Sequence, residues 1–587
     1  MSNFYQKKAR RRTNFLIVMF FLWIGIISWR LVDLQVFKYH RMKQRVISQN
    51  QRVISIIPKR GYIYDRQGKI LATSVLTESI YLIPSENETL HQRLEKIDKL
   101  KKIVSLKEKD IIRIKERIEK NKSFVWIKRK VSDQEAEQVR NLNLKGIDFI
   151  KENRRFYPKK NFAAHILGGV GIDEQGLNGI EREYDSQIFG KSGEALIQID
   201  AKRRRYQARI LKPPVQGKSL VLTIDETIQY IAEKELAHTV DKYRAKSGWV
   251  IIIDPWTGEV LALANYPSYN PNFYPEYSPS FWRNNAISYI YEPGSTFKII
   301  PVTSALEEEV VNYNEVFDCQ NGGIYLAGIR IDDHKNFSLL TLPEVIYHSS
   351  NVGAIKISLR LGEKKLYNYI KLFGFGEKTG IDLPGEEKGI LRNVSHWSAI
   401  SIGAITIGQE IGVTAIQMLR AATALANGGY LVNPRVIKKI ISSHGEETIS
   451  IVPPRKILTR QVALEMNQII QGVVNFGTGK AAQIEGYSVA GKTGTGQKID
   501  ESGEYSSKLF ISSFVGFAPA DGPAISMIIV INEPEKEHYG GIVAAPCFRN
   551  IALQVLRYLK IFPKKKKQDN LKYANYTFPK RTFRNET

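Results

Sequence analysis

The chain has 587 residues, too many for a single compact core, so two or more domains are expected. Hydrophobic residues make up 43% of it, which is typical of globular proteins and excludes a mostly disordered chain. The formal net charge of +26 suits work against anionic lipid headgroups or an acidic wall polymer as well as nucleic-acid binding. Two cysteines, Cys319 and Cys547, are too few for a disulfide framework or a CxxC metal site, and whether they pair is left open.

The N-terminal segment predicts a membrane anchor. A basic stretch, residues 1–13, precedes an apolar run from Phe15 to Trp29 that only Ser28 interrupts. As a helix that run spans about 22 Å, short of the ~30 Å hydrocarbon core, so the span is assigned to residues 14–36. No small-x-small cleavage site follows, which favours an uncleaved anchor over a signal peptide. Because basic flanks stay in the cytoplasm, we expect everything after the anchor to lie outside the cytoplasmic membrane.

Residues 37–214 are predicted to form a separate, non-catalytic α+β pedestal, because no cluster of catalytic side chains occurs there. Alternating apolar residues around Gln67-Gly68 predict a β-hairpin. Residues 90–121 have helical spacing, and Ser132-x-x-Glu135 is a capping box that opens another helix. Arg154 to Pro158 are interpreted as part of a turn.

A second domain is predicted over residues 215–562, after a proline pair that marks the boundary. Its predicted elements are, in chain order, a helix at 227–243, strands at 249–254, 260–264, 510–517 and 525–531 with helices between them, and a closing helix. The near-continuous apolar character of the strands indicates a sheet covered on both faces. The order predicts an α+β fold in which an antiparallel sheet lies between helical layers.

Three short motifs follow one another in this domain. They are Ser295-x-x-Lys298, Ser349-Ser350-Asn351 and Lys492-Thr493-Gly494-Thr495. Ser295 is predicted to open a buried helix, and a strand at 487–490 is predicted ahead of the third motif. Each motif alone is common by chance, but the ordered trio is a recognised signature of serine acyl transfer.

The residue types suit that chemistry. Ser295 needs a base one helical turn away, and Lys298 can serve if its amine is neutral, far below an ordinary lysine pKa of about 10.4. Burial and a second cation, Lys492, are both expected to lower that pKa. Ser349 is placed to relay a proton to the leaving amine, and Asn351 to orient Lys298 and the acyl amide.

The third motif is expected to bind substrate. Lys492 attracts a carboxylate, and the hydroxyls of Thr493 and Thr495 suit the same group. Gly494 is expected to leave the strand edge open to an extended substrate. Backbone N–H groups of Ser295 and Thr495 are expected to form the oxyanion hole. No metal or cofactor is expected, because no clustered His, Cys and carboxylate spacing is present.

Together with further motifs, these residues resemble the class B penicillin-binding proteins, the monofunctional D,D-transpeptidases of bacterial cell-wall synthesis. The further motifs are Arg60-Gly61 with Asp65-Arg66-x-Gly68, Gly176 to Glu181, Asp254 to Glu259, Val413 to Gln417, Asn427 to Gly429, and Gly540-Gly541 ahead of Ala544 to Pro546. The resemblance runs from the anchor to about residue 560. It implies a penicillin-binding, serine β-lactamase-like transpeptidase domain behind an elongated α+β pedestal of the dimerisation type.

The resemblance also implies the chemistry and the partners. Peptidoglycan stem peptides would be cross-linked through an acyl-enzyme on Ser295, and β-lactam antibiotics would acylate the same serine. A membrane glycan polymerase and other division proteins are the implied partners. Nucleic acid is not expected, because the chain is exported and its basic tail, residues 563–587, is predicted to be disordered.

The residues that occupy two of the motifs favour one branch of the family. Ser-Ser-Asn in the second motif and the Gly-Leu-x-Gly-Ile-Glu run that starts at Gly176 are similar to the septal, cell-division branch. The alternatives left open are an elongation-type transpeptidase, a D,D-carboxypeptidase or a β-lactamase, and a non-catalytic scaffold or β-lactam sensor. A β-lactamase of class A would carry a Glu-x-x-Asn motif that is absent between Ser349 and Lys492.

Overall fold

The computed structural model describes residues 2–43, 51–84, 88–122, 124–199, 205–500 and 502–564. The chain divides into two compact units. The first unit joins Met1–Lys59 to Gly190–Gln216, and the second joins Arg60–Phe189 to Gly217–Thr587. From residue 565 on, the predicted disordered tail lies outside the described residues.

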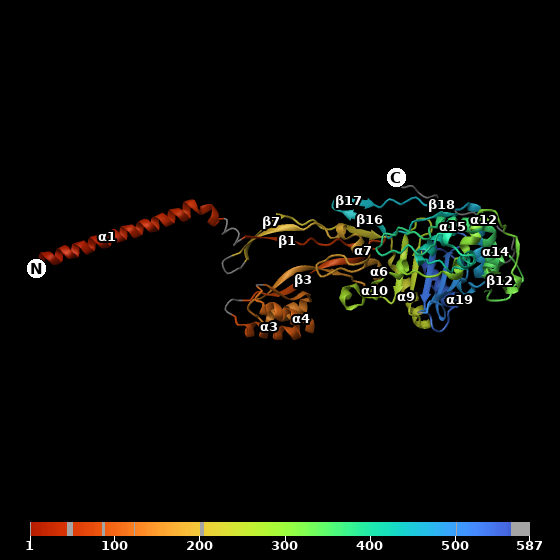
Figure 1. Ribbon diagram of the computed structural model, residues 1–587, viewed down its shortest axis with the longest axis horizontal. Helices are drawn as coiled ribbons and strands as arrows, with labels where there is room; N and C mark the ends of the chain where they lie inside the picture. Colours follow the sequence, from red (N-terminus) through yellow and green to blue (C-terminus); the bar gives the residue numbers. More distant parts are fainter. Residues whose placement is uncertain are drawn as a thin grey trace. The chain divides into compact units, whose positions relative to one another are not determined.

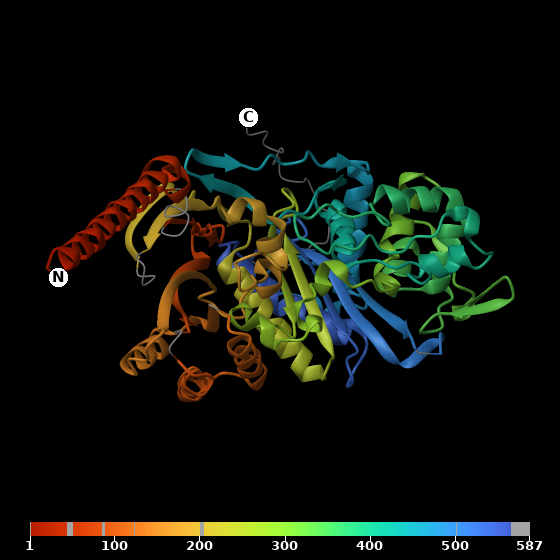
Figure 2. The ribbon, with the colours of Figure 1, turned by 60° about the vertical axis from the view of Figure 1, so that its left-hand side comes forward.

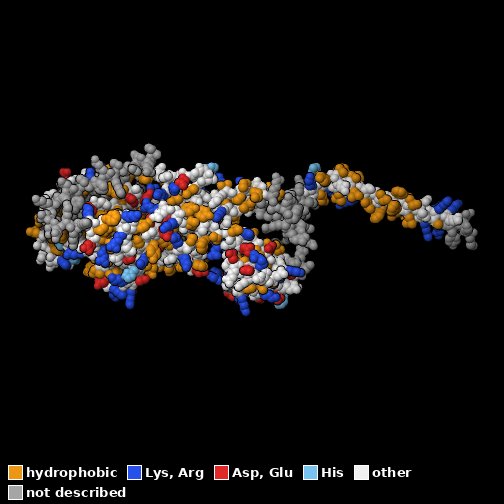
Figure 3. Space-filling view, turned by 180° about the vertical axis from the view of Figure 1, so that it is seen from behind, with side chains coloured by type: hydrophobic (Ala, Val, Ile, Leu, Met, Phe, Trp, Pro, Cys, Tyr) orange, Lys and Arg blue, Asp and Glu red, His pale blue; other side chains and the backbone are white. Residues whose placement is uncertain are grey.

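The first unit contains the predicted anchor. Helix α1 (Ser2–Val32) continues into a π-helical turn, Asp33–Phe37, and the part from Gln6 to Phe37 is long and apolar enough to cross a membrane. Figure 3 shows apolar side chains along this helix and basic ones at its N-terminal end. Asp33 pairs with Arg30 at 3.0 Å and with Lys38 at 2.6 Å, which neutralises its charge at the end of the span.

Beyond the anchor, the first unit is a small antiparallel sheet of order β1-β6-β7. Its strands are β1 (Gln51–Ile56), β6 (Gly193–Ile199) and β7 (Arg205–Lys212). Strand β1 pairs with β6, which lies about 140 residues further along the chain, so the unit forms only after the intervening chain has folded back.

The second unit begins with a mixed layer of strands and helices. Its strands are β2 (Ile63–Tyr64), β3 (Ile70–Leu82), β4 (Val125–Val131) and β5 (Ile147–Phe156), and its helices are α3 (Leu90–Ile103), α4 (Glu108–Glu119), α5 (Asp133–Asn141), α6 (Ala164–Leu167), α7 (Gly179–Glu183) and α8 (Asp185–Ile188). The hairpin at Gln67-Gly68 and the capping box of Ser132 and Glu135 are both confirmed. The predicted turn at Arg154 is wrong, because that residue pairs with Val75 inside the β3–β5 ladder.

The main sheet of the predicted second domain has five antiparallel strands in the order β10-β9-β21-β20-β19. Their bounds are β9 (Ser247–Ile253), β10 (Val260–Tyr266), β19 (Ala490–Ile499), β20 (Tyr505–Ala518) and β21 (Ile525–Asn532). Strands from opposite ends of the domain therefore meet at the β9–β21 pair, as the yellow-green and blue strands of Figure 2 show. The predicted antiparallel sheet is confirmed.

Helices cover both faces of this sheet. Their bounds are α9 (Glu226–Tyr243), α10 (Pro279–Trp282), α11 (Asn285–Ser288), α12 (Ile299–Glu307), α13 (Leu342–Tyr347), α14 (Asn351–Leu361), α15 (Glu363–Leu372), α16 (Ser401–Thr406), α17 (Ala415–Ala426), α18 (Arg460–Asn475) and α19 (Gly540–Tyr558). Val250 and Ile252 pack in one core with α9 and α19, which lie side by side in Figure 1. Trp249 and Ile251 pack in the other core with α12 and α17. This alternation explains why the strands are apolar at nearly every position.

Short strands complete the second unit. Two-stranded sheets pair β11 (Val316–Asp318) with β14 (Leu339–Thr341), β12 (Gly323–Leu326) with β13 (Ile329–Asp332), and β15 (Tyr430–Leu431) with β18 (Arg455–Lys456). A further sheet has the order β17-β16-β8-β2-β3-β4 and adds β8 (Ser219–Leu222), β16 (Ile437–Ser442) and β17 (Gly445–Thr448). Strand β2 pairs with β8, so one sheet contains residues that come before and after the Gly190–Gln216 segment in the chain.

Candidate active site

Ser295 lies in a tight turn rather than at the start of a helix. Residues Gly294–Thr296 form a single 3₁₀ turn, and α12 begins only at Ile299, with Lys298 as the residue before it. The turn is possible because Gly294 has φ +55, in the left-handed region that glycine adopts without strain. The predicted helix start is therefore four residues too early, although the serine and lysine still occupy one turn of helical backbone.

The third motif lies inside strand β19 and not after a strand ending at residue 490. A Cβ on Gly494 would lie 2.5 Å from Ser513 Oγ and 2.8 Å from Thr296 Cγ2. A Cβ on Gly294 would lie 2.8 Å from the carbonyl oxygen of Thr495. The glycine at 494 thus lets the strand approach the serine turn, a role that the sequence did not predict, and its expected role at the substrate edge stays a prediction.

The three motifs meet at Ser349. The fully buried Lys298 Nζ donates to the Ser349 carbonyl oxygen at 2.6 Å, to Asn351 Oδ1 at 2.6 Å and to Ser349 Oγ at 3.3 Å. Lys492 Nζ donates to the same hydroxyl at 3.0 Å and to the Thr493 carbonyl at 3.2 Å. Ser349 itself has φ +60, a strained backbone for a residue other than glycine. Two buried amines therefore share one hydroxyl.

Burial changes the acid–base chemistry of both lysines. It lowers the pKa of Lys298 from 10.5 to about 7, and the carboxylate of Asp333 opposes this shift. Burial and the nearby Lys298 lower the pKa of Lys492 well below its ordinary value. Desolvation is thus the cause that lowers the pKa of Lys298, whereas the repulsion between the two amines lowers the pKa of Lys492. The pair should titrate as a unit.

Asp333 holds the second motif in place, and sequence reasoning did not find it. Its carboxylate accepts hydrogen bonds from the backbone N–H groups of Asn351 and Val352 and from Ser350 Oγ, the last at 2.7 Å. The Asn351 amide nitrogen in turn donates to the Asp332 carbonyl at 2.7 Å. No local sequence pattern predicts this role, because the aspartate lies 18 residues before Asn351 and contacts it only in the folded chain.

The two threonines of the third motif have neighbours that fix their side chains. The Thr493 and Thr478 hydroxyls are 2.7 Å apart, and Thr495 Oγ1 accepts the Gly540 N–H at 3.1 Å. A Cβ on Gly540 would lie 2.3 Å from the Gly494 carbonyl oxygen, so the start of α19 packs tightly against β19. In the sequence this contact corresponds to the Gly540-Gly541 pair, but the pair alone does not predict which strand it packs against.

Two other features bear on what the chain can hold. Cys319 and Cys547 are both buried free thiols, so the open question of a disulfide is answered. Among the described residues, no group of three or more His, Cys, Asp or Glu side chains is placed to hold a metal ion.

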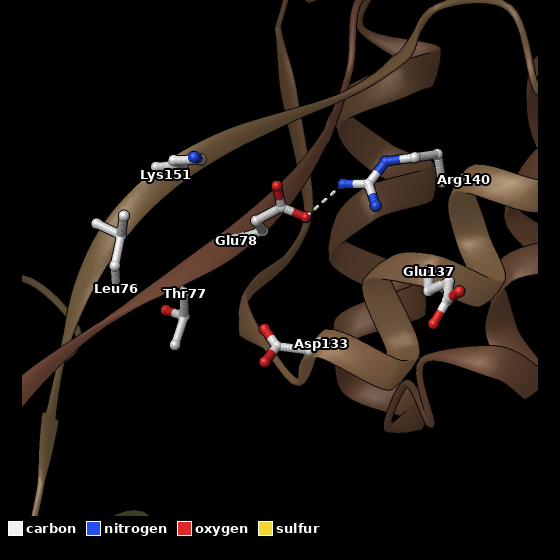
Figure 4. Close-up of a pocket in the computed structure, with 7 residues that line it drawn as sticks. All are labelled: Leu76, Thr77, Glu78, Asp133, Glu137, Arg140 and Lys151. Carbon is white, nitrogen blue, oxygen red and sulfur yellow. Dashed lines mark hydrogen bonds and ion pairs between the residues drawn. The ribbon is translucent and has the colours of Figure 1, made fainter.

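A groove of about 430 Å³ lies between strands β3 and β5 and helix α5. Figure 4 shows Glu78 and Arg140 turned toward each other across it, with Asp133 and Glu137 on the helix side. The carboxylate of Glu78 and the guanidinium of Arg140 form an ion pair of 2.6 Å. Its lining lacks a nucleophile beside a base, so the Ser295 site remains the candidate active site.

Comparison with known proteins identifies the family. Residues 248–553 match the family model of the penicillin-binding protein transpeptidase domain, and residues 55–222 match that of the penicillin-binding protein dimerisation domain. The chain is 33% identical over 569 residues to the stage V sporulation protein D of Bacillus subtilis, covering 95% of this chain and 87% of that protein. It is 32% identical over 554 residues to the peptidoglycan D,D-transpeptidase FtsI of Escherichia coli, covering 93% and 91%.

Comparison with solved structures supports the same family assignment. Penicillin-binding protein 3 of Mycobacterium tuberculosis, in complex with aztreonam, aligns with a TM-score of 0.68 at 26% identity, covering 87% of this chain and 98% of that one. The same protein in complex with ampicillin aligns with a TM-score of 0.69 at 25% identity, covering 88% and 98%. The resemblance inferred from the motifs is thereby confirmed. The chain belongs to the class B penicillin-binding proteins and carries the dimerisation and transpeptidase domains of that family.

Proposed function

We propose that this chain is a peptidoglycan D,D-transpeptidase that cross-links stem peptides through an acyl-enzyme on Ser295. The observation that carries the proposal is the convergence of three sequence motifs on one hydroxyl, Ser349 Oγ, contacted by both buried lysines. Relatives over nearly the whole chain include proteins named peptidoglycan D,D-transpeptidases, which supports the same activity.

Acylation begins with the neutral amine of Lys298, which takes the proton of Ser295 as Oγ attacks the peptide carbonyl carbon. The C–O bond forms, and the carbonyl oxygen becomes an oxyanion facing the backbone N–H groups of Ser295 and Thr495. The proton passes through Ser349 to the leaving amine, the C–N bond breaks, and an ester remains. An acceptor amine on a second stem peptide then attacks the ester carbonyl carbon, so that a new C–N bond forms and the C–O bond to Ser295 breaks. The surplus proton of the amine returns to Ser295 Oγ through Lys298.

The resting contacts of Lys298 suit its protonated form, because an ammonium can donate all three of its hydrogen bonds at once. A neutral amine has only two N–H groups, so one of these bonds is lost and the lone pair is freed to accept the serine proton. The weakest contact, that to Ser349 Oγ at 3.3 Å, is the one we expect to open. While that contact is open, the hydrogen bond from Lys492 keeps Ser349 Oγ in place.

Substrate recognition is proposed for the edge formed by β19. A carboxylate at the end of the stem peptide would meet the hydroxyls of Thr493 and Thr495, near the Lys492 amine. The same groups would bind the carboxylate of a β-lactam, which acylates Ser295 as a substrate would. These roles agree with the location of all three residues on one strand next to the serine turn.

The cellular setting is proposed from the N-terminal helix and from the residues that occupy the motifs. The basic residues in the N-terminal part of α1 favour a single-pass protein whose N-terminus is cytoplasmic and whose transpeptidase domain faces the wall. A role in the division septum is supported by the FtsI relative and by the Ser-Ser-Asn motif. A membrane glycan polymerase and other division proteins are the proposed partners, because cross-linking requires newly made strands beside the anchor.

A second setting, synthesis of a spore wall, is favoured by the relative named stage V sporulation protein D. Depletion of the protein separates the two settings. If the role is septal, depletion should give filamentous cells that do not complete their septa. Normal division of growing cells would contradict this role.

Covalent labelling with a fluorescent penicillin tests the active site. Full-length protein in detergent is expected to take up one label, and Ser295→Ala to take up none while its melting temperature is unchanged. Ser443→Ala, which removes an exposed serine, is the matched control and should label like the unaltered protein. Labelling of the Ser295 variant at the normal rate would refute the assignment.

A further inference from the structure

His334 directly follows the two aspartates that contact the Ser349 loop. The Asn351 amide nitrogen donates to the Asp332 carbonyl at 2.7 Å, and the Asn351 backbone N–H donates to the Asp333 carboxylate. The backbone that leads into His334 is therefore fixed against a residue that lies two positions after Ser349.

A group of aromatic rings links His334 to the other side of the same loop. Its ring meets the ring of Phe337 edge-on, with centroids 5.7 Å apart and an interplanar angle of 67°. Phe337 in turn stacks on His348 at 5.4 Å and 27°, and His348 is the residue directly before Ser349. Because these contacts involve residues before and after Ser349, they place His334 next to the loop that carries the shared hydroxyl.

The charges that act on His334 agree with this location. Partial burial lowers the pKa of His334, and so do the amines of Lys298, Lys335 and Lys492, while the carboxylate of Asp333 opposes the shift. An ordinary histidine pKa is about 6.5, so this ring is neutral at pH 7 and one of its nitrogens is an acceptor. The side chain is exposed, and its ring forms no hydrogen bond within the described chain. A substrate can therefore reach it.

The second half of the proposed reaction needs such an acceptor. The amine that attacks the ester on Ser295 must be neutral, and it then carries two N–H groups as well as its lone pair. Acceptors close to the Ser349 hydroxyl are already engaged, because the Lys298 amine donates to the Ser349 carbonyl and to Asn351 Oδ1, both at 2.6 Å. The neutral ring of His334 is a free acceptor beside this loop.

We propose that His334 accepts a hydrogen bond from the acceptor amine of the second stem peptide and turns its lone pair toward the ester on Ser295. The inference rests on the proposed function and extends it to the acceptor side of the site. One N–H of the amine is held by the His334 ring. The lone pair forms the new C–N bond as the C–O bond to Ser295 breaks, and the proton of the other N–H returns to Ser295 Oγ through Lys298. The imidazole stays neutral throughout.

Steady-state kinetics with full-length protein in detergent tests this role. The donor is an acyl-D-alanyl thioester, whose released thiol reports acylation of Ser295, and the acceptor is a soluble tripeptide with a free lysine side-chain amine. His334→Phe keeps a ring against Phe337 but has no acceptor. It should raise the KM for the tripeptide by about tenfold, while the rates of acylation by the donor and by penicillin stay unchanged.

His334→Gln makes the opposite change, because it loses the ring and keeps an acceptor in its amide oxygen. Its KM for the tripeptide should stay within about threefold of the unaltered value. His444→Phe, at an exposed position in the turn between β16 and β17, is the matched control and should change neither acylation nor transfer.

A ring that serves only for packing predicts the reverse order, with the phenylalanine variant normal and the glutamine variant impaired. That order overturns the proposal, and so does an equal KM in both His334 variants or a parallel loss of acylation in His334→Phe. Acylation followed by hydrolysis alone, with no transfer to the tripeptide, also overturns it. Failure of the donor and of penicillin to acylate the unaltered protein would instead overturn the proposed function, and this inference with it.

Discussion

At the scale of single residues, the site depends on two lysines placed where lysine is ordinarily unfavourable. Lys298 is fully buried and Lys492 is 1% exposed, so each loses the hydration of its ammonium. Both direct hydrogen bonds to the Ser349 hydroxyl, and Ser349 adopts a strained backbone with φ +60 to receive them. This combination of desolvated charge and local strain is typical of a functional site and not of a structural core.

The pH dependence of acylation follows from the pKa of Lys298, which burial lowers to about 7. The amine acts as a base only when it has lost its proton, so the rate should rise with pH through about 7 and level off above it. Between pH 6 and pH 5 the second-order rate constant for penicillin acylation is expected to fall by about tenfold. Stopped-flow measurement of labelling checks this, with tryptophan fluorescence as a control for folding. A constant rate from pH 5 to pH 8.5 would show that Lys298 is not the base.

At the scale of elements, the loop between α13 and α14 is held by a distant carboxylate. Ser350 is the N-cap of α14, and its hydroxyl accepts the Gly353 N–H at 3.0 Å while donating to Asp333 at 2.7 Å. The same aspartate binds the N–H groups of Asn351 and Val352, the first residues of the helix, where a negative charge is favourable. Asp333 thus positions the loop that carries Ser349 without being placed to contact the reacting atoms.

Asp333→Asn should therefore act in two ways. Loss of a charged acceptor loosens the loop and should slow acylation by about tenfold. Loss of the negative charge also removes an interaction that raises the pKa of Lys298, so the acid limb of the pH profile should move to lower pH. The neighbouring Asp332→Asn, which removes an exposed partner of Arg330, is the control and should leave the limb unmoved. A shift to higher pH in the Asp333 variant would contradict this role.

A second element-scale feature is the buried charge network near the start of the second unit. Glu181 on α7 accepts from Arg60 Nε and from Arg155 Nε of β5, both at 2.6 Å, and all three side chains are at most 3% exposed. Arg60 also donates to Asp185 at 2.7 Å. Because the two arginines belong to segments about 95 residues apart, the glutamate joins elements that no local interaction would bring together.

Glu181→Gln would leave two buried guanidinium groups without full compensation. We expect it to lower the free energy of unfolding by about 3–5 kcal/mol, the cost of breaking a buried ion pair from one side. Glu183→Gln, an exposed position on the same short helix, should change it by less than about 0.5 kcal/mol. Thermal melting followed by circular dichroism compares the two. Equal stability of both variants would mean that the network contributes little.

At the scale of the whole molecule, the question is which side of the membrane each part occupies. The helix from Gln6 to Phe37 is long and apolar enough to span, and its first residues, up to Arg12, are rich in lysine and arginine. The described chain beyond it holds both matched domains. An N-terminus retained in the cytoplasm would place both domains on the wall side, where their proposed substrate is found.

A reporter fused after His40 tests this orientation. Alkaline phosphatase, which is active only outside the cytoplasm, should be active in this fusion, whereas a reporter that fluoresces only in the cytoplasm should be dark. Replacing the five basic residues at positions 7, 8 and 10–12 with glutamine should reduce export, because the charge bias that orients the span is lost. A bright cytoplasmic reporter in the unaltered fusion would reverse the assignment.

The sequence by itself determined the family, the sheet and the three short motifs of the candidate active site, because these depend on patterns carried by neighbouring residues. Apolar runs indicated the two-sided sheet, and the spacing of Ser295 and Lys298 indicated one turn of helical backbone. Only the tertiary structure decided how these parts are held. It showed that Gly494 faces the serine turn, that Asp333 holds the second motif and that Arg155 is buried in a strand. Such contacts join residues far apart in the chain, so they depend on how the layers pack and leave no local pattern to read.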